Sequence, residues 1–346
     1  MSHPNQKPRS APLSRAMLMI VLAASVTSLK AAEPVTLANF VRAESDTMIR
    51  ANMDMLGVSI GSLVHLRDPI TPENQPVIRM NQDTLYSGTI IDLSEPLEFT
   101  LPEAGGRYMS MHVVSQDHYM LFESQPGTYT LTEESVGTRF ALLTVRTLVD
   151  ITDPEDIAKA HAAQDAISIS GGGKGPFEAP DWDLEDLKLA RQALSDLGTL
   201  GFDTTYAFGT REQVRPIDHL VAAGAGWGGL PPAAAYYTMG MVEANDGKTP
   251  YSVTVKDVPV DAFWSITVYN AEGYLEANDL GINNYNNYKA TPNEDGSYTI
   301  HFGACDDGRI NCIPITQGWN HAVRLYQPRE EILNGSWSFP DFEPVN

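Results

Sequence analysis

The sequence predicts an α+β protein built mostly of antiparallel strands, with an N-terminal α+β domain and a C-terminal jelly-roll-like β-sandwich. Three observations indicate this class: a helical pattern from 36 to 56, short alternating runs from 77 to 146, and further alternating runs from 251 onward. A chain of 346 residues is long enough to bury a sizeable core in two domains.

Three helices are predicted in the first two-thirds of the chain. Between 36 and 56 the apolar residues recur on one face, and a glycine follows as a stop. Asp153, followed by proline, is typical of a helix start and predicts a helix to about Ala166. The third helix is expected over 184–197 with its end at Gly198.

Period-two alternation predicts two groups of strands. The N-terminal group comprises 85–93, 97–101, 108–114, 128–131 and 140–145, and the C-terminal group comprises 251–255, 263–269, 298–302 and 322–326. Within 250–269, two strands joined at Lys256 to Asp261 carry bulky side chains. Trp264 is expected in the core because Ile266 and Val268 share its face.

These elements predict domain boundaries. Residues 1–32 are assigned to a signal peptide, 33–170 to the N-terminal domain, 171–235 to a linker and helical connection, and 236–346 to the sandwich. The glycine-rich stretch Ser170–Pro176 is expected to be the loop that links the domains. It is not a phosphate-binding loop, because the Lys-Ser/Thr ending and a preceding strand are both missing.

The charge balance is strongly acidic. Lys and Arg number 23 against 44 Asp and Glu, which gives a net charge of -21. Such a surface repels phosphate backbones and anionic membranes, so nucleic acid is not an expected partner. Solubility of an exported protein is the simplest interpretation of this charge.

The N-terminus has the order of a secretory signal. Lys7, Arg9 and Arg15 precede an apolar run over 16–29, and small residues follow. The run is too short to span a bilayer comfortably, so we expect no stable membrane span after cleavage between about Ser28 and Ala32. The pattern predicts a periplasmic or secreted protein.

The chain has two cysteines, Cys305 and Cys312, on either side of a glycine-containing turn. In an oxidising compartment, thiols this close most plausibly form a disulfide that closes a loop. A metal or redox pair is the rival interpretation, but it lacks a second ligand pair or a C-x-x-C spacing.

Longer motifs carry a family resemblance. They are Asn81–Ser87, Gly106–Tyr108, Val260–Tyr269, Asp295–Ser297, and Gly318–Asn320 followed by Val323–Tyr326. Together they resemble the bacterial exported family of paired domains of unknown function, numbers 1254 and 1214, over nearly the whole mature chain. The resemblance implies that the first motif belongs to an N-terminal α+β domain and the Phe-Trp-Ser strand to a C-terminal jelly-roll-like domain. It implies export and names no reaction.

The first of these motifs gathers donors and acceptors at a strand start. Asp83 can act as a general base or ligand anchor, with Arg107 as its ion partner or as an oxyanion clamp. Asn81 and Asp83 can equally tie a turn through side-chain to backbone bonds, with Tyr86 packed against it. Both interpretations predict that these side chains are buried.

The histidines show no metal-ligand spacing, so no metal site is predicted from neighbouring residues. If one histidine acts in catalysis, we expect it to be His118 or His65, because the family resemblance also covers Asp117–Tyr119 and His65–Arg67. His161 is explained as a helix-surface pair with Asp165.

Two functional hypotheses follow. The first is a hydrolase in which Asp83 or His118 activates water and Arg107 stabilises the oxyanion, supported by His65 or Tyr86. The second is a non-catalytic protein that binds a glycan or small molecule through an aromatic and amide surface formed by Asn81, Trp319, Tyr285 and Tyr288. A pure scaffold is the remaining alternative, and the cofactor is unknown because no nucleotide or haem motif is present.

Overall fold

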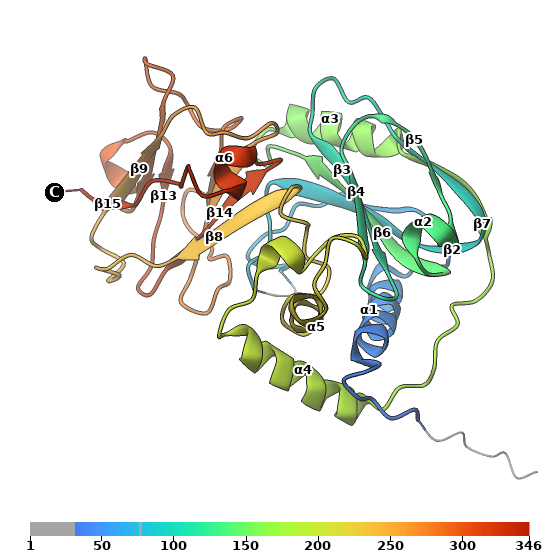
Figure 1. Cartoon of the computed structure of the whole chain (residues 1–346). Helices are drawn as coiled ribbons and strands as arrows, with labels where there is room; N and C mark the ends of the chain where they lie inside the picture. The colour runs from blue at the N-terminus through green and yellow to red at the C-terminus, as the bar shows by residue number, and fades with distance from the viewer. Residues whose placement is uncertain (1–31, 76–77, 346) are drawn as a thin grey trace, which may run out of the picture.

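The computed structural model describes residues 32–75 and 78–345, which form an N-terminal sheet covered by helices and a C-terminal pair of smaller sheets (Figure 1). The structure confirms the mixed α+β class and the antiparallel pairing of most strands. The predicted signal peptide lies outside the described residues, apart from Ala32. Within the described ranges, no helix is both long and apolar enough to cross a bilayer.

The N-terminal sheet has seven strands. Its order is β1-β2-β6-β3-β4, and β5 and β7 also pair with β2. The strands are β1 (Val64–Leu66), β2 (Thr84–Leu101), β3 (Met109–Ser115), β4 (Met120–Glu123), β5 (Gly127–Leu131), β6 (Phe140–Leu148) and β7 (Ser168–Gly173). The two predicted strands over 85–101 are one long strand, whose pairing with β7 shifts register between Asp92 and Leu97. Pro96 lies at this irregularity, where a missing N–H is tolerated.

Helices cover both faces of this sheet. The helices of the N-terminal part are α1 (Phe40–Leu56), α2 (Glu133–Val136), α3 (Pro154–Asp165), α4 (Leu184–Gly198) and α5 (Pro216–Ala225), whereas α6 (Glu330–Leu333) packs on the sandwich core. On one face, Ala163 of α3 belongs to the core cluster that contains Met111 and Val145. On the other face, Ile49 of α1 packs against Ile90 and Leu142. The Asp153 cap is confirmed, since its side chain accepts from the Glu155 N–H at 2.9 Å.

The predicted loop Ser170–Pro176 begins as a strand. Residues 168–173 form β7, and Gly171 lies so close to β2 that an added Cβ would stand 2.6 Å from the Pro96 carbonyl oxygen. Gly171 and Gly172 also have positive φ values of 75° and 70°, which other residues rarely adopt. The glycines therefore allow close strand pairing here, and they do not mark a flexible linker.

The segment predicted to connect the domains also belongs to the N-terminal body. Leu187 of α4 and Val221 of α5 share a core cluster with Phe40 of α1. The sequence analysis missed α5, because its glycines and alanines dilute the apolar pattern. The predicted stop, Gly198, is the last residue of α4, and Thr199 is its C-cap.

The C-terminal part is a sandwich of two four-stranded sheets, ordered β11-β10-β14-β8 and β13-β12-β9-β15. Its strands are β8 (Ala235–Gly240), β9 (Tyr251–Val255), β10 (Trp264–Tyr269), β11 (Asn284–Asn286), β12 (Tyr298–Phe302), β13 (Cys312–Ile313), β14 (Asn320–Tyr326) and β15 (Glu343–Pro344). Side chains from both sheets form one core, which includes Trp264 as predicted. The jelly-roll connectivity stays a prediction.

Two details of the sandwich depart from a simple antiparallel hairpin pattern. The strands of the 250–269 stretch enter different sheets, so their connection crosses the sandwich instead of forming a hairpin. β12 and β13 pair in parallel. The Cys305–Cys312 disulfide is present, with a Cα–Cα distance of 5.6 Å, and it closes the loop between these two strands.

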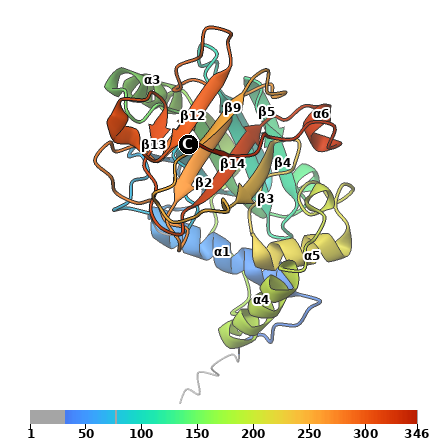
Figure 2. The same ribbon diagram turned by 90° about the vertical axis from the view of Figure 1, so that its left-hand side faces the viewer.

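The sheet containing β8, β10 and β14 has a second face that meets the N-terminal sheet. Figure 2 shows the sandwich strands in front of the N-terminal sheet. Phe263, Tyr326 and Ala235 of the sandwich form one buried cluster with Tyr108 and Leu148 of the N-terminal sheet. This cluster fixes the junction between the two parts.

Candidate functional site

Asp83 is fully buried at this junction and bonds across it. One carboxylate oxygen accepts from the Ser265 hydroxyl at 2.6 Å, and the other accepts from the side-chain amides of Asn284 at 2.9 Å and Asn286 at 3.2 Å. All three donors are neutral groups of β10 and β11. The carboxylate therefore ties the start of β2 to the sandwich.

Asn81 shapes the turn that carries Asp83. Its side-chain oxygen accepts from the Asp83 N–H at 2.8 Å, and its amide donates to the Tyr326 hydroxyl at 2.8 Å. This is the turn-forming arrangement expected as the alternative to a site. Both residues are buried, as both interpretations predicted.

Arg107 pairs with Asp156 of α3 instead of Asp83. Its guanidinium donates to Asp156 at 2.9 Å and to the Leu148 carbonyl at 2.5 Å. The hydrogen bond from Arg107 is the main cause that lowers the pKa of Asp156. Arg107 is thus held in one orientation on the N-terminal side of the junction.

A groove of about 730 Å³ opens beside this ion pair. Arg107, Asp150 and Asp156 line it from the N-terminal part, and Asn286 and Tyr288 line it from the sandwich. A smaller hollow of about 210 Å³ shares Arg107 and Tyr288. Tyr288 is 57% exposed, and Asn286 connects the groove to Asp83 through its amide.

His118 lies in a different region, in the turn between β3 and β4. It is fully buried with a φ of 61°, and its Nε2 accepts from the Gly228 N–H at 2.9 Å. Its ring stacks on Trp227 with centroids 5.9 Å apart. Burial, with a smaller effect of His219, lowers the pKa of His118 to about 3, so the ring is neutral at physiological pH.

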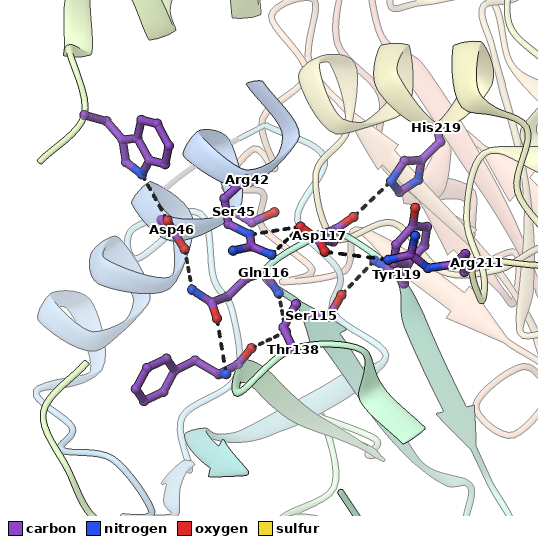
Figure 3. A network of polar contacts seen from close by, with 12 residues as sticks. Arg42, Ser45, Asp46, Ser115, Gln116, Asp117, Tyr119, Thr138, Arg211 and His219 are labelled. Atoms are coloured by element: carbon purple, nitrogen blue, oxygen red, sulfur yellow. Dashed lines mark hydrogen bonds and ion pairs between the residues drawn. The ribbon is translucent and has the colours of Figure 1, made fainter. Parts of the chain in front are cut away.

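The surroundings of this turn form a structural network (Figure 3). The Gln116 side chain donates to the buried Asp46 at 2.7 Å, and Asp117 forms an ion pair with Arg42 at 2.6 Å. His219 shares a 3.0 Å hydrogen bond with the Asp117 carbonyl. These contacts fasten α1 and α5 to the turn, which accounts for the polar residues flanking His118.

The structure does not bring Asp83, Arg107 and His118 into one cluster. Ser115 ends β3, three residues before His118. It lies in register with Ile91 of β2, because both residues pair with Ala141 of β6. The strand from Asp83 to Ile91 spans roughly 26 Å at a rise of about 3.3 Å per residue. Asp83 and His118 therefore lie at opposite ends of the sheet.

His65 and Tyr86 also lie apart, on opposite faces of the N-terminal sheet. His65 shares a 2.8 Å hydrogen bond with Ser87, which also accepts from Gln164 of α3. Burial, followed by the charge of Arg67, lowers the pKa of His65. Tyr86 points to the other face, since neighbouring strand residues alternate, and its ring lies 5.5 Å from the Arg146 guanidinium.

Two of the four proposed ligand-binding residues belong to the sandwich core. Trp319 is 0% exposed and stacks on Phe302 at 5.4 Å, and Tyr285 is 8% exposed in the same core. Their rings fill space between the sheets and present no platform to the groove. Of the predicted aromatic residues, Tyr288 is the one that lines it.

Family comparisons agree with this division of the chain. Residues 60–171 match the family described as protein of unknown function DUF1254, and residues 234–330 match the one described as protein of unknown function DUF1214. The chain belongs to the DUF1254/DUF1214 family. No curated protein matches it.

The DUF1254/DUF1214 fold also occurs in a crystal structure, that of the VPA0106 protein from Vibrio parahaemolyticus. That protein is 20% identical, and the superposition covers 90% of this chain and 98% of the other with a TM-score of 0.70. At this identity the likeness concerns the fold alone. A putative uncharacterized protein from Burkholderia cenocepacia is 14% identical over 89% of this chain and 88% of its own, with a TM-score of 0.48.

Sequence reasoning missed several polar residues of this DUF1254/DUF1214 protein's junction. Asp150, Asp156 and Asn286 line the groove, and Arg146 and Arg324 lie between the sheets. Arg146 had a detectable signal, since it is the one charged residue in the apolar strand over 140–148. Asp156 could not be recognised from the sequence, because acidic residues are common in the first turn of a helix.

Proposed function

We propose that this protein binds a carbohydrate in the groove at the junction of its two parts. The observation that carries the proposal is the groove itself, whose 730 Å³ falls within the range of about 300–1,000 Å³ typical of small-ligand sites. Its walls come from both parts, and junctions of this kind are preferred places for ligand sites.

The lining suits a polyhydroxylated ligand. Tyr288 offers an exposed ring on which the apolar face of a sugar can stack. Glu103, Asp150 and Asp153 can accept hydrogen bonds from sugar hydroxyls, and Asn286 can donate them. The groove has two basic residues, Arg107, which pairs with Asp156, and Lys159. The acidic residues outnumber them, so the lining favours a neutral or amino sugar over an acidic one.

Binding is better supported than hydrolysis. A hydrolase built on Asp83 needs that carboxylate to reach water near Arg107, but its oxygens accept from Ser265, Asn284 and Asn286 in a fully buried setting. The other proposed base, His118, lies at the far end of β3. We therefore propose the non-catalytic alternative.

Calorimetry with oligomers of N-acetylglucosamine, glucosamine and glucose tests the proposal on the full chain. Tyr288→Ala is expected to weaken binding about ten-fold or more through loss of the stacking surface, whereas Tyr288→Phe keeps the ring and the affinity. Tyr274→Ala is the matched control, because Tyr274 is 38% exposed and is not among the groove's lining residues. Binding that survives Tyr288→Ala unchanged, or silence with all three oligomers, overturns the proposal.

We also propose that the protein acts outside the cytoplasm. The charged, apolar and small-residue order of 1–32 and the Cys305–Cys312 disulfide support export. Expression of the full chain in a Gram-negative host, followed by osmotic-shock fractionation and mass measurement, tests this. A periplasmic protein cleaved near residue 30 agrees with the proposal, and an uncleaved cytoplasmic protein contradicts it.

A further inference from the structure

On the face of the N-terminal sheet that meets the sandwich, four side chains carry buried polar atoms that lack a hydrogen-bond partner within residues 32–75 and 78–345. They are the Tyr108 hydroxyl, the Ser110 hydroxyl, His112 Nε2 and Arg146 Nη1, and we call them the polar row. We propose that the polar row binds the carboxylate of a small organic acid between the two parts of the protein.

Strand geometry places the row on one face. Tyr108, Ser110 and His112 alternate along the β3 segment, so they share a face, and Arg146 of β6 pairs directly with Ser110. Tyr86 of β2 pairs with Arg146 on its other side. Tyr108 packs against Phe263 and Tyr326, so this face is the one that meets the sandwich.

Arg146 has no carboxylate partner. None of the ion pairs formed by the described residues includes it, and its Nη1 is buried. A guanidinium stays charged in proteins, and a buried charge without a counter-ion is costly. The fold therefore keeps a cation in place that an anionic ligand would neutralise.

The nearby charged groups do not supply that counter-ion. Asp83 accepts from neutral donors, and Arg324 donates to Thr267 and Tyr269 at 2.8 Å and 2.6 Å and to the Arg79 carbonyl at 3.0 Å. Arg146 and Arg324, the two guanidiniums between the sheets, therefore both lack a carboxylate hydrogen-bond partner among the described residues. Lys289 lies toward the groove, within electrostatic reach of Asp150 and Asp83.

The other members of the row are neutral groups. Burial raises the pKa of Tyr108 to about 12 and also raises the pKa of Tyr326, so these hydroxyls keep their protons. Burial, and then the charge of Arg146, lowers the pKa of His112 well below its usual range. The Ser110 hydroxyl lies near that of Tyr108 without reaching hydrogen-bond geometry. Hydroxyls beside a guanidinium suit a carboxylate.

The part of β8 that faces the row is exposed to solvent. Ala235 of β8 touches Tyr108 in the junction cluster, and Tyr237 and Met239 continue the same face of β8. They are 39% and 57% exposed, so this end of the β8 face is open to solvent. Tyr237 lies within electrostatic reach of Arg146 and Tyr86.

This lining selects the chemical class of the ligand. A planar carboxylate matches the guanidinium fork, and the rings of Tyr86 and Tyr237 with the Met239 side chain provide apolar contact for an aromatic or short aliphatic body. A phosphate also fits a guanidinium, but it offers no apolar part to these side chains. The larger carbohydrate groove has no polar-row residue in its lining, so this inference is independent of the proposed function.

Ligand titrations of the full chain at constant ionic strength test the inference, with sodium benzoate, sodium octanoate, inorganic phosphate and the uncharged analogue benzamide as probes. We expect benzoate or octanoate to saturate in calorimetry and to raise the thermal midpoint, and benzamide and phosphate to do neither. Saturation by phosphate alone, saturation by benzamide, or no saturation by either carboxylate overturns the inference.

Arg146→Gln is the decisive variant. It should weaken carboxylate binding about ten-fold or more, and it should leave the ligand-free midpoint unchanged or higher because it removes an unpaired buried charge. Arg139→Gln is the matched control, since Arg139 lies next to the start of the same strand but pairs with Asp92 at 2.8 Å. The control should lower the midpoint and keep carboxylate binding.

Two outcomes contradict the inference directly. They are wild-type carboxylate affinity in Arg146→Gln, and a loss of affinity in Arg139→Gln as large as in Arg146→Gln. If Arg146→Gln does not fold, Arg146→Lys replaces it, because lysine keeps the charge but loses the planar fork. Arg146→Lys should then bind carboxylates several-fold more weakly than wild type, and equal affinity overturns the inference.

Discussion

The Asp83 carboxylate and the Ser265 hydroxyl meet at 2.6 Å in the buried junction, although they are 182 positions apart in the sequence. Ser265 lies beside Arg324 in the sandwich sheet, and Asp83 stands at the start of β2. The hydrogen bond therefore connects the strand that organises the N-terminal sheet to the central strands of the sandwich. A charged acceptor makes this contact stronger than an ordinary hydroxyl bond.

Ser265→Ala should lower the free energy of unfolding by about 2 kcal/mol, because it removes a buried hydrogen bond to a charged group. Chemical denaturation measures the change. Ser252→Ala is the control, since Ser252 is on β9 in the outer sheet and is only half-buried, and it should stay within about 0.5 kcal/mol of wild type. Equal effects of the two substitutions would show that the Asp83 contact contributes nothing to stability.

Arg139→Gln should destabilise the protein at neutral pH and much less in acid. Hydrogen bonds from Arg139 are the main cause that lowers the pKa of Asp92 from 3.8 to about 2. The pair therefore stabilises the fold above about pH 4 and loses this contribution as the pH falls toward 2. Because Arg139 is 34% exposed and screened by water, we expect only a modest loss of stability at pH 7.

The pH dependence of that loss is the measurement that matters. Denaturation of wild type and Arg139→Gln from pH 7 down to pH 2 should give two curves that converge on the acid side. A difference that stays constant over this range would contradict the ion-pair explanation and would point to lost packing of the Arg139 stem over Phe140.

The local elements were predictable because their signals are local. The Asp153 cap, the strand over 251–255 and the Cys305–Cys312 loop each depend on residues close in sequence, and each is confirmed. The glycines of β7 were predicted to form a loop, and this was wrong. Their strand conformation depends on a tertiary contact, the close approach of Pro96. Composition alone makes such a stretch look like a loop.

The candidate site was less predictable because its geometry is set by long-range contacts. Asp83 was singled out, but its partners Ser265, Asn284 and Asn286 belong to the other part of the chain. Arg107 and His118 flank β3, whose place in the sheet the sequence does not specify. A polar residue in a shared motif therefore indicated burial more reliably than it indicated a common site.

His118→Asn should reduce the acid sensitivity of the fold. The folded-state pKa of His118 is about 3, far below its ordinary value of 6.5, mainly because the ring is buried. The unfolded chain therefore binds a proton that the folded chain excludes, and wild-type stability falls as the pH drops below 6.5. Asparagine tolerates the φ of 61°, but its shorter side chain gives up the hydrogen bond that His118 Nε2 accepts from the Gly228 N–H.

Thermal midpoints at pH 7.5 and pH 4.5 test this expectation. His118→Asn should lose stability at pH 7.5, because a smaller side chain leaves a cavity beside Trp227, but it should lose less than wild type on acidification. His161→Asn is the control, since His161 is only partly buried on α3, and it should keep the wild-type pH response. An unchanged pH response in His118→Asn would mean that other groups govern acid stability.

Removal of the disulfide should destabilise the sandwich without rearranging it. The bond closes a short loop between Cys305 and Cys312, and the entropy of closing a ring of this size corresponds to about 2.5 kcal/mol. The double variant Cys305→Ser, Cys312→Ser should therefore unfold at lower denaturant concentration, while Phe302 and Ile313 keep the two strands in the core. Reduction of wild type with dithiothreitol should reproduce the loss, and the reductant should have no effect on the double variant. A reductant effect on the double variant would mean that the loss does not come from this bond, because the sequence has no other cysteine.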